Sequence, residues 1–144
     1  MNEREHFRKL AIKRGLTPGA LIDADPLGFD LLLIAAQRQF AEGRNYSERE
    51  VNEVLKHWLQ TSGGMLAVDH VEMRRWLVDM GILTRDVYGQ AYSRAPLPVR
   101  LKEMDSALAT LDFNAEFNAV NEAEAKKRAA RKAAWQREQK QAIP

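Results

Sequence analysis

Four arginines in the middle of this chain have the chemistry to bind phosphate groups. Arg74 and Arg75 are adjacent, whereas Arg85 and Arg94 lie on either side of Tyr88. A guanidinium carries a permanent charge and several N–H donors that suit phosphate oxygens, and an exposed tyrosine can stack on a nucleobase. A second basic group lies near the C-terminus and consists of Lys126, Lys127, Arg128, Arg131 and Lys132. Together these ten residues form the candidate nucleic-acid-binding set.

The charge of the chain is unevenly distributed. Residues 27–95 carry eight basic and nine acidic side chains, a net charge of −1, whereas residues 122–144 carry seven basic and three acidic ones, a net charge of +4. A domain that grips phosphates usually shows a basic excess or stripe. Phosphate binding by the central part would therefore depend on where its individual arginines lie.

Each candidate also has a plainer interpretation. Arg74 and Arg75 could instead pair with Glu72, Asp79, Asp86 or the glutamates of the helix that follows Ser47, and surface ion pairs of this kind are common and contribute little free energy. The basic tail, in turn, is equally consistent with non-specific nucleic-acid binding and with a solvated helix that only adds charge. We leave both alternatives open at this point.

The sequence offers no residues for catalysis. The chain has no cysteine, which excludes thiol catalysis and cysteine-zinc sites. The histidines His6, His57 and His70 lack the spacing of metal ligands, and there is no phosphate-binding glycine loop or serine nucleophile motif. We therefore expect a protein that is not an enzyme and has no cofactor, metal ion or small-molecule ligand.

The chain also lacks the features of a membrane or exported protein. No apolar run reaches the roughly 18–20 residues that a membrane span needs, and the first ten residues are charged rather than apolar. We expect a cytoplasmic protein without a membrane partner.

Helical spacing and capping signals define the elements that must position the candidate residues. Asp25 followed by Pro26 starts a helix that we expect to run to about Ala41 and to be buried on most sides. Ser47 and Glu50 form a capping box for the next helix. We further expect a helix over residues 3–14, a short helical turn at residues 18–22, a helix over residues 68–80 ended by Gly81, and a β-hairpin formed by residues 82–86 and 90–94.

Two apolar helix faces are expected to be buried, either against other parts of the chain or against a partner. On the expected helix 68–80, the side opposite the core carries Val68, Val71 and Val78 beside Arg75, whereas a free recognition helix should show polar and basic residues there. Either the terminal helices or a partner would cover it. A second amphipathic face, able to dock on the domain or on a second copy, consists of Leu101, Met104, Leu108 and Leu111.

Three stretches of residues 40–94 form one combined motif: Gly43-Arg44-x-Tyr46-Ser47-Glu48-x-Glu50-Val51-Asn52, then Arg74-Arg75-x-Leu77-Val78-Asp79-x-Gly81-x-Leu83-x-Arg85, then Gly89-x-x-Tyr92-x-Arg94. Through these stretches, residues 40–94 resemble the prokaryotic domain-of-unknown-function family 2087. The resemblance implies a winged-helix-like fold and a loose association with bacterial transcription, because members occur alone or attached to transcriptional regulators. It implies no catalytic residues.

These observations predict a mainly α protein with a small β-hairpin. Residues 27–95 would form a winged helix-turn-helix-like domain, preceded by a helical arm over residues 1–26 and followed by a helical extension with a basic tail over residues 96–144. One hypothesis for its function is duplex-DNA binding by a small bacterial transcriptional regulator or accessory factor. The alternative is a non-catalytic module for protein interaction or homo-oligomerisation.

Overall fold

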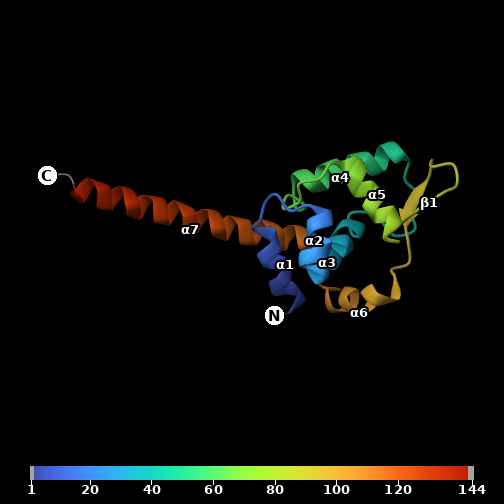
Figure 1. Ribbon diagram of the computed structural model, residues 1–144, viewed down its shortest axis with the longest axis horizontal. Coiled ribbons are helices and arrows are strands. Elements are labelled where there is room, and N and C mark those ends of the chain that lie inside the picture. Colours follow the sequence, from blue (N-terminus) through green and yellow to red (C-terminus); the bar gives the residue numbers. More distant parts are fainter. Residues whose placement is uncertain (1, 143–144) are drawn as a thin grey trace.

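The helix α3 (Pro26–Gln37) lies at the centre of the protein in the computed structural model, which describes residues 2–142 (Figure 1). Each residue from Leu31 to Ala36 exposes 1% or less of its surface, as predicted from the all-round apolar sequence. Asp25 caps the helix by accepting a hydrogen bond of 3.0 Å from the Gly28 amide. The helix ends at Gln37, earlier than expected, because Gln39 and Phe40 donate to carbonyls three residues back and tighten the last turn.

The N-terminal segment packs into the same core. Helix α1 (Glu3–Ala11) buries Phe7, Leu10 and Ala11, and α2 (Pro18–Ala24) follows in place of the shorter helical turn that we expected. Between the two helices, the Leu16 amide donates to the Met65 carbonyl at 3.0 Å. This segment is therefore tied by its backbone to the middle of the chain.

The two helices before the hairpin begin at polar caps. Helix α4 (Glu48–Gln60) starts at the predicted capping box, in which Glu50 donates its amide to the Ser47 hydroxyl at 3.1 Å and its carboxylate accepts from the Ser47 amide at 3.0 Å. Helix α5 (His70–Asp79) begins two residues later than expected because Asp69 is its cap and accepts from the Glu72 amide at 2.8 Å. Gly81 follows α5 with a φ of +75°, which suits its predicted role as a helix stop.

Strands β1 (Leu83–Arg85) and β2 (Tyr92–Arg94) pair antiparallel, with Thr84 opposite Ser93. The backbone of Tyr46 also pairs with Tyr92, through hydrogen bonds of 2.7 and 2.8 Å, and so joins the loop before α4 to the hairpin. The prediction of a mainly α protein with a small β-hairpin is confirmed. The order α4, α5, β1, β2 is the predicted order of helix, helix and hairpin.

Helix α6 (Val99–Ala107) lies against α3. Leu101 and Leu108 are buried in the common core, and Met104 and Leu111 pack partly buried against it. The apolar face that we considered for a partner is therefore used inside the chain, because α3 needs cover on this side. One core extends from Phe7 to Phe117, so the three predicted segments share it.

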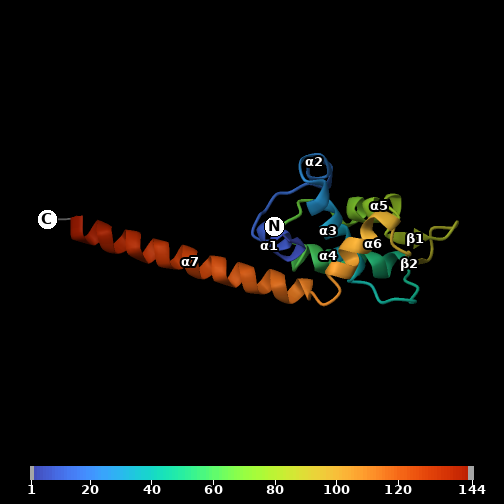
Figure 2. The same cartoon turned by 90° about the horizontal axis from the view of Figure 1, so that it is seen from below.

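The last helix, α7 (Phe113–Ala142), has an anchored part and a projecting part (Figures 1 and 2). Its root, residues 113–121, packs on α1: the Phe7 and Phe113 rings meet edge to face at 4.9 Å, and Asn121 donates to the Ala11 carbonyl at 3.0 Å. The projecting segment, residues 122–142, runs away from the domain for about 30 Å at 1.5 Å per residue. All its residues are exposed except Glu124 and Ala134, which are half-buried.

A buried carboxylate fixes the direction of this helix. Glu116 accepts hydrogen bonds from Arg4, at 3.1 Å, and from Arg8, both on α1. Burial alone would raise the pKa of Glu116, but the two guanidinium groups outweigh that effect and hold its pKa below the ordinary value. The charged form of Glu116 therefore stabilises the packing of α7 on α1.

We predict that Glu116 makes the protein sensitive to acid. A carboxylate with a lowered folded-state pKa contributes stability above its unfolded pKa of about 4.3, and this contribution is lost as the pH falls through the folded-state value. Glu116→Gln should lower the free energy of unfolding by about 1 kcal/mol at pH 7 and should flatten its decline between about pH 5 and pH 3. Urea unfolding at several pH values measures this. Glu103→Gln, at an exposed position on α6, is the control, and an equal effect of both substitutions would contradict the prediction.

Candidate nucleic-acid interface

Arg74 lies inside a network that joins α4, α5 and β2. Its guanidinium donates to Asn52 Oδ1 at 2.5 Å and pairs with Glu48 Oε1 at 3.2 Å, and only 13% of its side chain is exposed. The same Glu48 oxygen accepts from the Tyr92 hydroxyl at 3.3 Å. Arg74 therefore holds the helix pair to the hairpin, and its donors face the protein rather than solvent.

Arg94 is also directed inward. Its guanidinium donates to the Phe40 carbonyl at 3.4 Å and to Gln37 Oε1 at 3.3 Å. The amide nitrogen of Gln37, a buried residue, donates to the carbonyls of Ile82 and Ala95 at 2.9 and 3.0 Å. Arg94 and Gln37 thus attach the base of the hairpin to the end of α3, which is a structural role.

The other candidates around the hairpin are exposed. Arg75 and Arg85 have no carboxylate within 4.0 Å among residues 2–142, and Tyr88, at the hairpin tip, is 80% exposed. Arg75 lines a shallow hollow with Glu72, Trp76 and Asp79. Two carboxylates thus flank the one cation on the open side of α5, so this helix presents no basic surface to DNA.

The valines beside Arg75 are only partly covered. Val68, Val71 and Val78 are all half-buried, and Val68 and Val78 pack against the core of their own domain. Helix α5 makes its main contacts with α4 and β1. The terminal helices are therefore not the main cover of α5 that we considered, and its outer side has little apolar surface left for a partner.

The largest group of exposed cations is on the projecting segment of α7. Residues 125–142 carry seven basic side chains and one acidic side chain, a net charge of +6. Lys126 and Arg131 pair with Glu122 and Glu124 at 3.6 and 3.9 Å. Within the part of the chain that the structure describes, no carboxylate lies within 4.0 Å of the five other cations, which are Lys127, Arg128, Lys132, Arg137 and Lys140.

The candidate residues do not form one continuous patch. In both views the hairpin lies at one end of the molecule and the free end of α7 at the other (Figures 1 and 2). The hairpin, which carries Arg85 and Tyr88, is therefore separated from the basic segment by the body of the domain, and α5, which carries Arg75, lies next to the hairpin.

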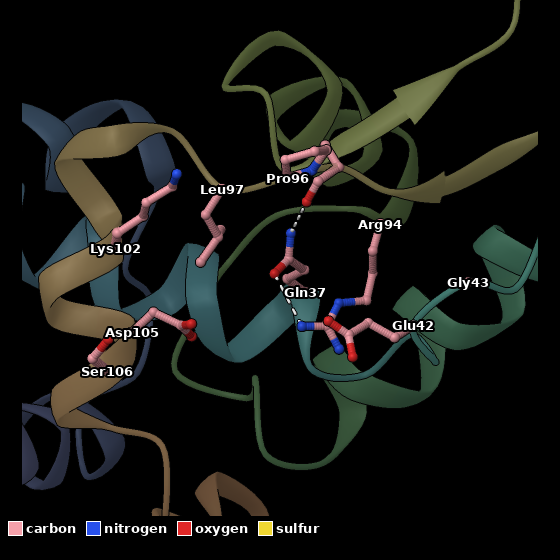
Figure 3. Close-up of a pocket in the computed structure, with 10 residues that line it drawn as sticks. Gln37, Glu42, Gly43, Arg94, Pro96, Leu97, Lys102, Asp105 and Ser106 are labelled. Atoms are coloured by element: carbon pink, nitrogen blue, oxygen red, sulfur yellow. Dashed lines mark hydrogen bonds between the residues drawn. The ribbon is translucent and has the colours of Figure 1, made fainter.

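A cleft of about 570 Å³ lies between α6 and the base of the hairpin (Figure 3). Its lining includes Gln37, Arg94, Lys102 and Asp105. Asp105 forms an ion pair with Arg38 at 2.9 Å, and Arg94 donates a hydrogen bond to Gln37. The polar groups here mostly serve to join α3, α6 and the hairpin.

A histidine and an aspartate form one further pair. His6 Nε2 lies 2.7 Å from Asp25 Oδ2. Burial by itself would raise the pKa of Asp25, but the hydrogen bonds from His6 and from the Gly28 amide outweigh it, and the pKa lies below its ordinary value. A Cβ at position 28 would lie 2.2 Å from this carboxylate, so any larger residue there would displace the Asp25 side chain from its pairing with His6. The pair caps α3 and attaches α1 to it.

The described residues contain no group of three or more histidine, aspartate or glutamate side chains placed to hold a metal ion. Over the same part of the chain, no helix combines the length and the apolar character needed to cross a membrane.

The fold and the exposed cations define a helix-rich domain with a β-hairpin wing and a projecting basic helix. Residues 30–94 match the family model described as "Uncharacterized protein conserved in bacteria (DUF2087)". The predicted resemblance to this family is thus confirmed, and the match begins ten residues earlier than expected, so that it includes most of α3. No curated protein and no solved structure matches the chain.

Two residues of the interface region escaped the sequence-based prediction. Gln37 lies at the end of an apolar run, and nothing in its spacing signals a buried amide that bonds two loop carbonyls. Trp135 is the one large apolar side chain of residues 122–142, and it is 60% exposed within the basic segment. Its isolation in a run of alanine, lysine and arginine could have indicated an exposed aromatic side chain among cations.

We predict that the two adjacent arginines respond differently to substitution. Arg74→Ala removes a nearly buried cation and leaves Asn52 and Glu48 without their partner, so the free energy of unfolding should fall by about 2 kcal/mol. Arg75→Ala, on the exposed side of α5, should change it by less than about 0.5 kcal/mol. Urea unfolding monitored by circular dichroism provides the measurement. Equal effects at the two positions would show that Arg74 is not the structural member of the pair.

Proposed function

We propose that the protein binds nucleic acid, duplex DNA included, through the projecting segment of α7, and acts as a transcriptional regulator or accessory factor without reading base sequence through α5. The observation that supports this most strongly is the net charge of +6 over residues 125–142 on a helix that extends into solvent. Such a partner would place the protein in the cytoplasm.

The geometry of the segment favours phosphate contacts. Side chains of Lys127, Arg128 and Lys132 extend from a regular helix, so their charges keep a fixed spacing along its axis. Lysine and arginine release counterions when they neutralise phosphates, and this makes the affinity high at low salt and independent of sequence. The helix itself is supported by its alanine content and by its anchored root.

The exposed residues at the other end of the molecule would add a weaker, separate contact. Arg75 and Arg85 are accessible, and Tyr88 extends from the hairpin tip. Their surroundings include Glu72, Asp79 and Asp86, which would repel phosphates. We therefore assign them a minor share of the affinity and exclude Arg74 and Arg94, whose donors are used internally.

A charge-reduction experiment tests the proposal. The variant Lys127→Gln, Arg128→Gln, Lys132→Gln keeps good helix formers and removes three cations that have no carboxylate close by. At about 50 mM salt, it should bind a 20-base-pair duplex at least tenfold more weakly than the unmodified protein. The slope of log affinity against log salt should become shallower by as much as 0.9 for each lost phosphate contact. Fluorescence anisotropy of a labelled duplex measures both quantities.

A matched control removes three exposed cations elsewhere: Lys9→Gln, Lys13→Gln, Lys102→Gln. Both variants have the same net charge, so a loss confined to the α7 variant identifies the segment rather than the overall charge. The double variant Arg75→Ala, Arg85→Ala should weaken binding by less than the α7 variant. The proposal fails if no binding is measurable at low salt, or if the α7 variant and the control bind equally well.

A further inference from the structure

Trp135 lies among the cations of the projecting segment with most of its indole in solvent. It is 60% exposed, and its helical neighbours three, four and seven residues earlier are Lys132, Arg131 and Arg128. Residues at these spacings share one side of a helix, and a helical side chain covers the turn before it. Trp135 therefore shares one side of the helix with these cations, on a segment of α7 that runs away from the rest of the domain (Figure 2).

We propose that this tryptophan and its neighbouring cations form a binding site for single-stranded nucleic acid, in which a base stacks on the indole while the cations contact the flanking phosphates. The inference rests on the proposed function and specifies its ligand. Stacking on an aromatic side chain is tolerant of sequence and requires a base whose face is accessible. In a duplex, each base face is already covered by its neighbours, so the indole favours a single strand.

Charge argues for a polyanion over other occupants. A second copy of α7 alongside the first would bring together two segments that each carry a net charge of +6, and like charges repel. A membrane surface would require a broad apolar face, whereas residues 122–142 offer alanines, charges distributed around the helix and one tryptophan.

The experiment compares a 12-nucleotide deoxythymidine strand with a 12-base-pair duplex, both titrated against the full chain at about 50 mM salt. Trp135→Ala should weaken binding of the single strand by roughly tenfold, within the range that loss of one stacked base produces. Binding of the duplex should change by less than about twofold. Alanine is a better helix former than tryptophan, so the loss would not come from an unfolded helix. Trp135→Phe should retain most of the single-strand affinity.

Tyr88→Ala is the comparison variant, because Tyr88 is an even more exposed aromatic residue, 80% against 60% for Trp135, on the hairpin at the opposite end of the molecule. Because the hairpin contributes only a minor share of the proposed affinity, Tyr88→Ala should weaken binding of the single strand by much less than Trp135→Ala does. The single strand should also quench the tryptophan fluorescence of the unmodified protein. Most of this quenching should disappear in Trp135→Phe, since Trp58 is buried and Trp76 is half-buried against Phe29.

The proposal is overturned if Trp135→Ala affects strand and duplex equally or affects neither. It is also overturned if Tyr88→Ala causes the loss, if light scattering shows a dimer that Trp135→Ala dissolves, or if phosphatidylglycerol vesicles rather than the strand shift the fluorescence of Trp135. Failure of the broader function gives a different pattern, in which removal of Lys127, Arg128 and Lys132 charges leaves the binding of both nucleic acids unchanged.

Discussion

Burial of α3 on all sides is the constraint on which the rest of the structure depends. A helix in which six consecutive residues are almost completely buried cannot be covered by one neighbour, because an amphipathic helix covers a single face. Helices α1, α2 and α6 each contribute apolar side chains to this cover. The N-terminal and C-terminal segments are consequently parts of the domain, and the apolar face of α6 is not available to a partner.

The same constraint explains what the residues of the family resemblance do. Glu48, Asn52, Arg74 and Tyr92 belong to the stretches that carry the resemblance, and they meet in one hydrogen-bonded network between α4, α5 and the hairpin. Arg94 fixes the base of the hairpin to the end of α3 through Gln37. These residues orient the elements of the fold. Since no solved structure matches the chain, the comparison with a winged helix rests on the order of those elements.

Local sequence signals predicted the helices and the hairpin well, but they did not predict which arginines would be exposed and which would be bonded within the fold. The Ser47–Glu50 capping box and the Asp25–Pro26 helix start depend on contacts within three residues, so a linear pattern contains the information they need. Arg74 is used inside the fold because it contacts Asn52 on α4, which is 22 residues away in the sequence. Its neighbour Arg75 is exposed to solvent. The sequence left phosphate binding and ion pairing open for both arginines. The fold shows that Arg74 is paired internally and that Arg75 is exposed.

Placing the proposed nucleic-acid contact on α7 instead of α5 changes the mechanism of binding that the architecture could support. A recognition helix in a winged helix reads base edges because its domain presses it into the major groove, whereas α7 is held only at its root, by Glu116 and the aromatic contacts with α1. A helix fixed only at one end can lie along a phosphate backbone, but no domain packs against its projecting part to hold it in the major groove for base-specific contacts. The projecting segment and the hairpin are also at opposite ends of the molecule, so their affinities combine only on a ligand long enough to reach both. Under the proposed function, a short strand would contact α7 alone, and the domain would serve chiefly to anchor that helix and hold its direction.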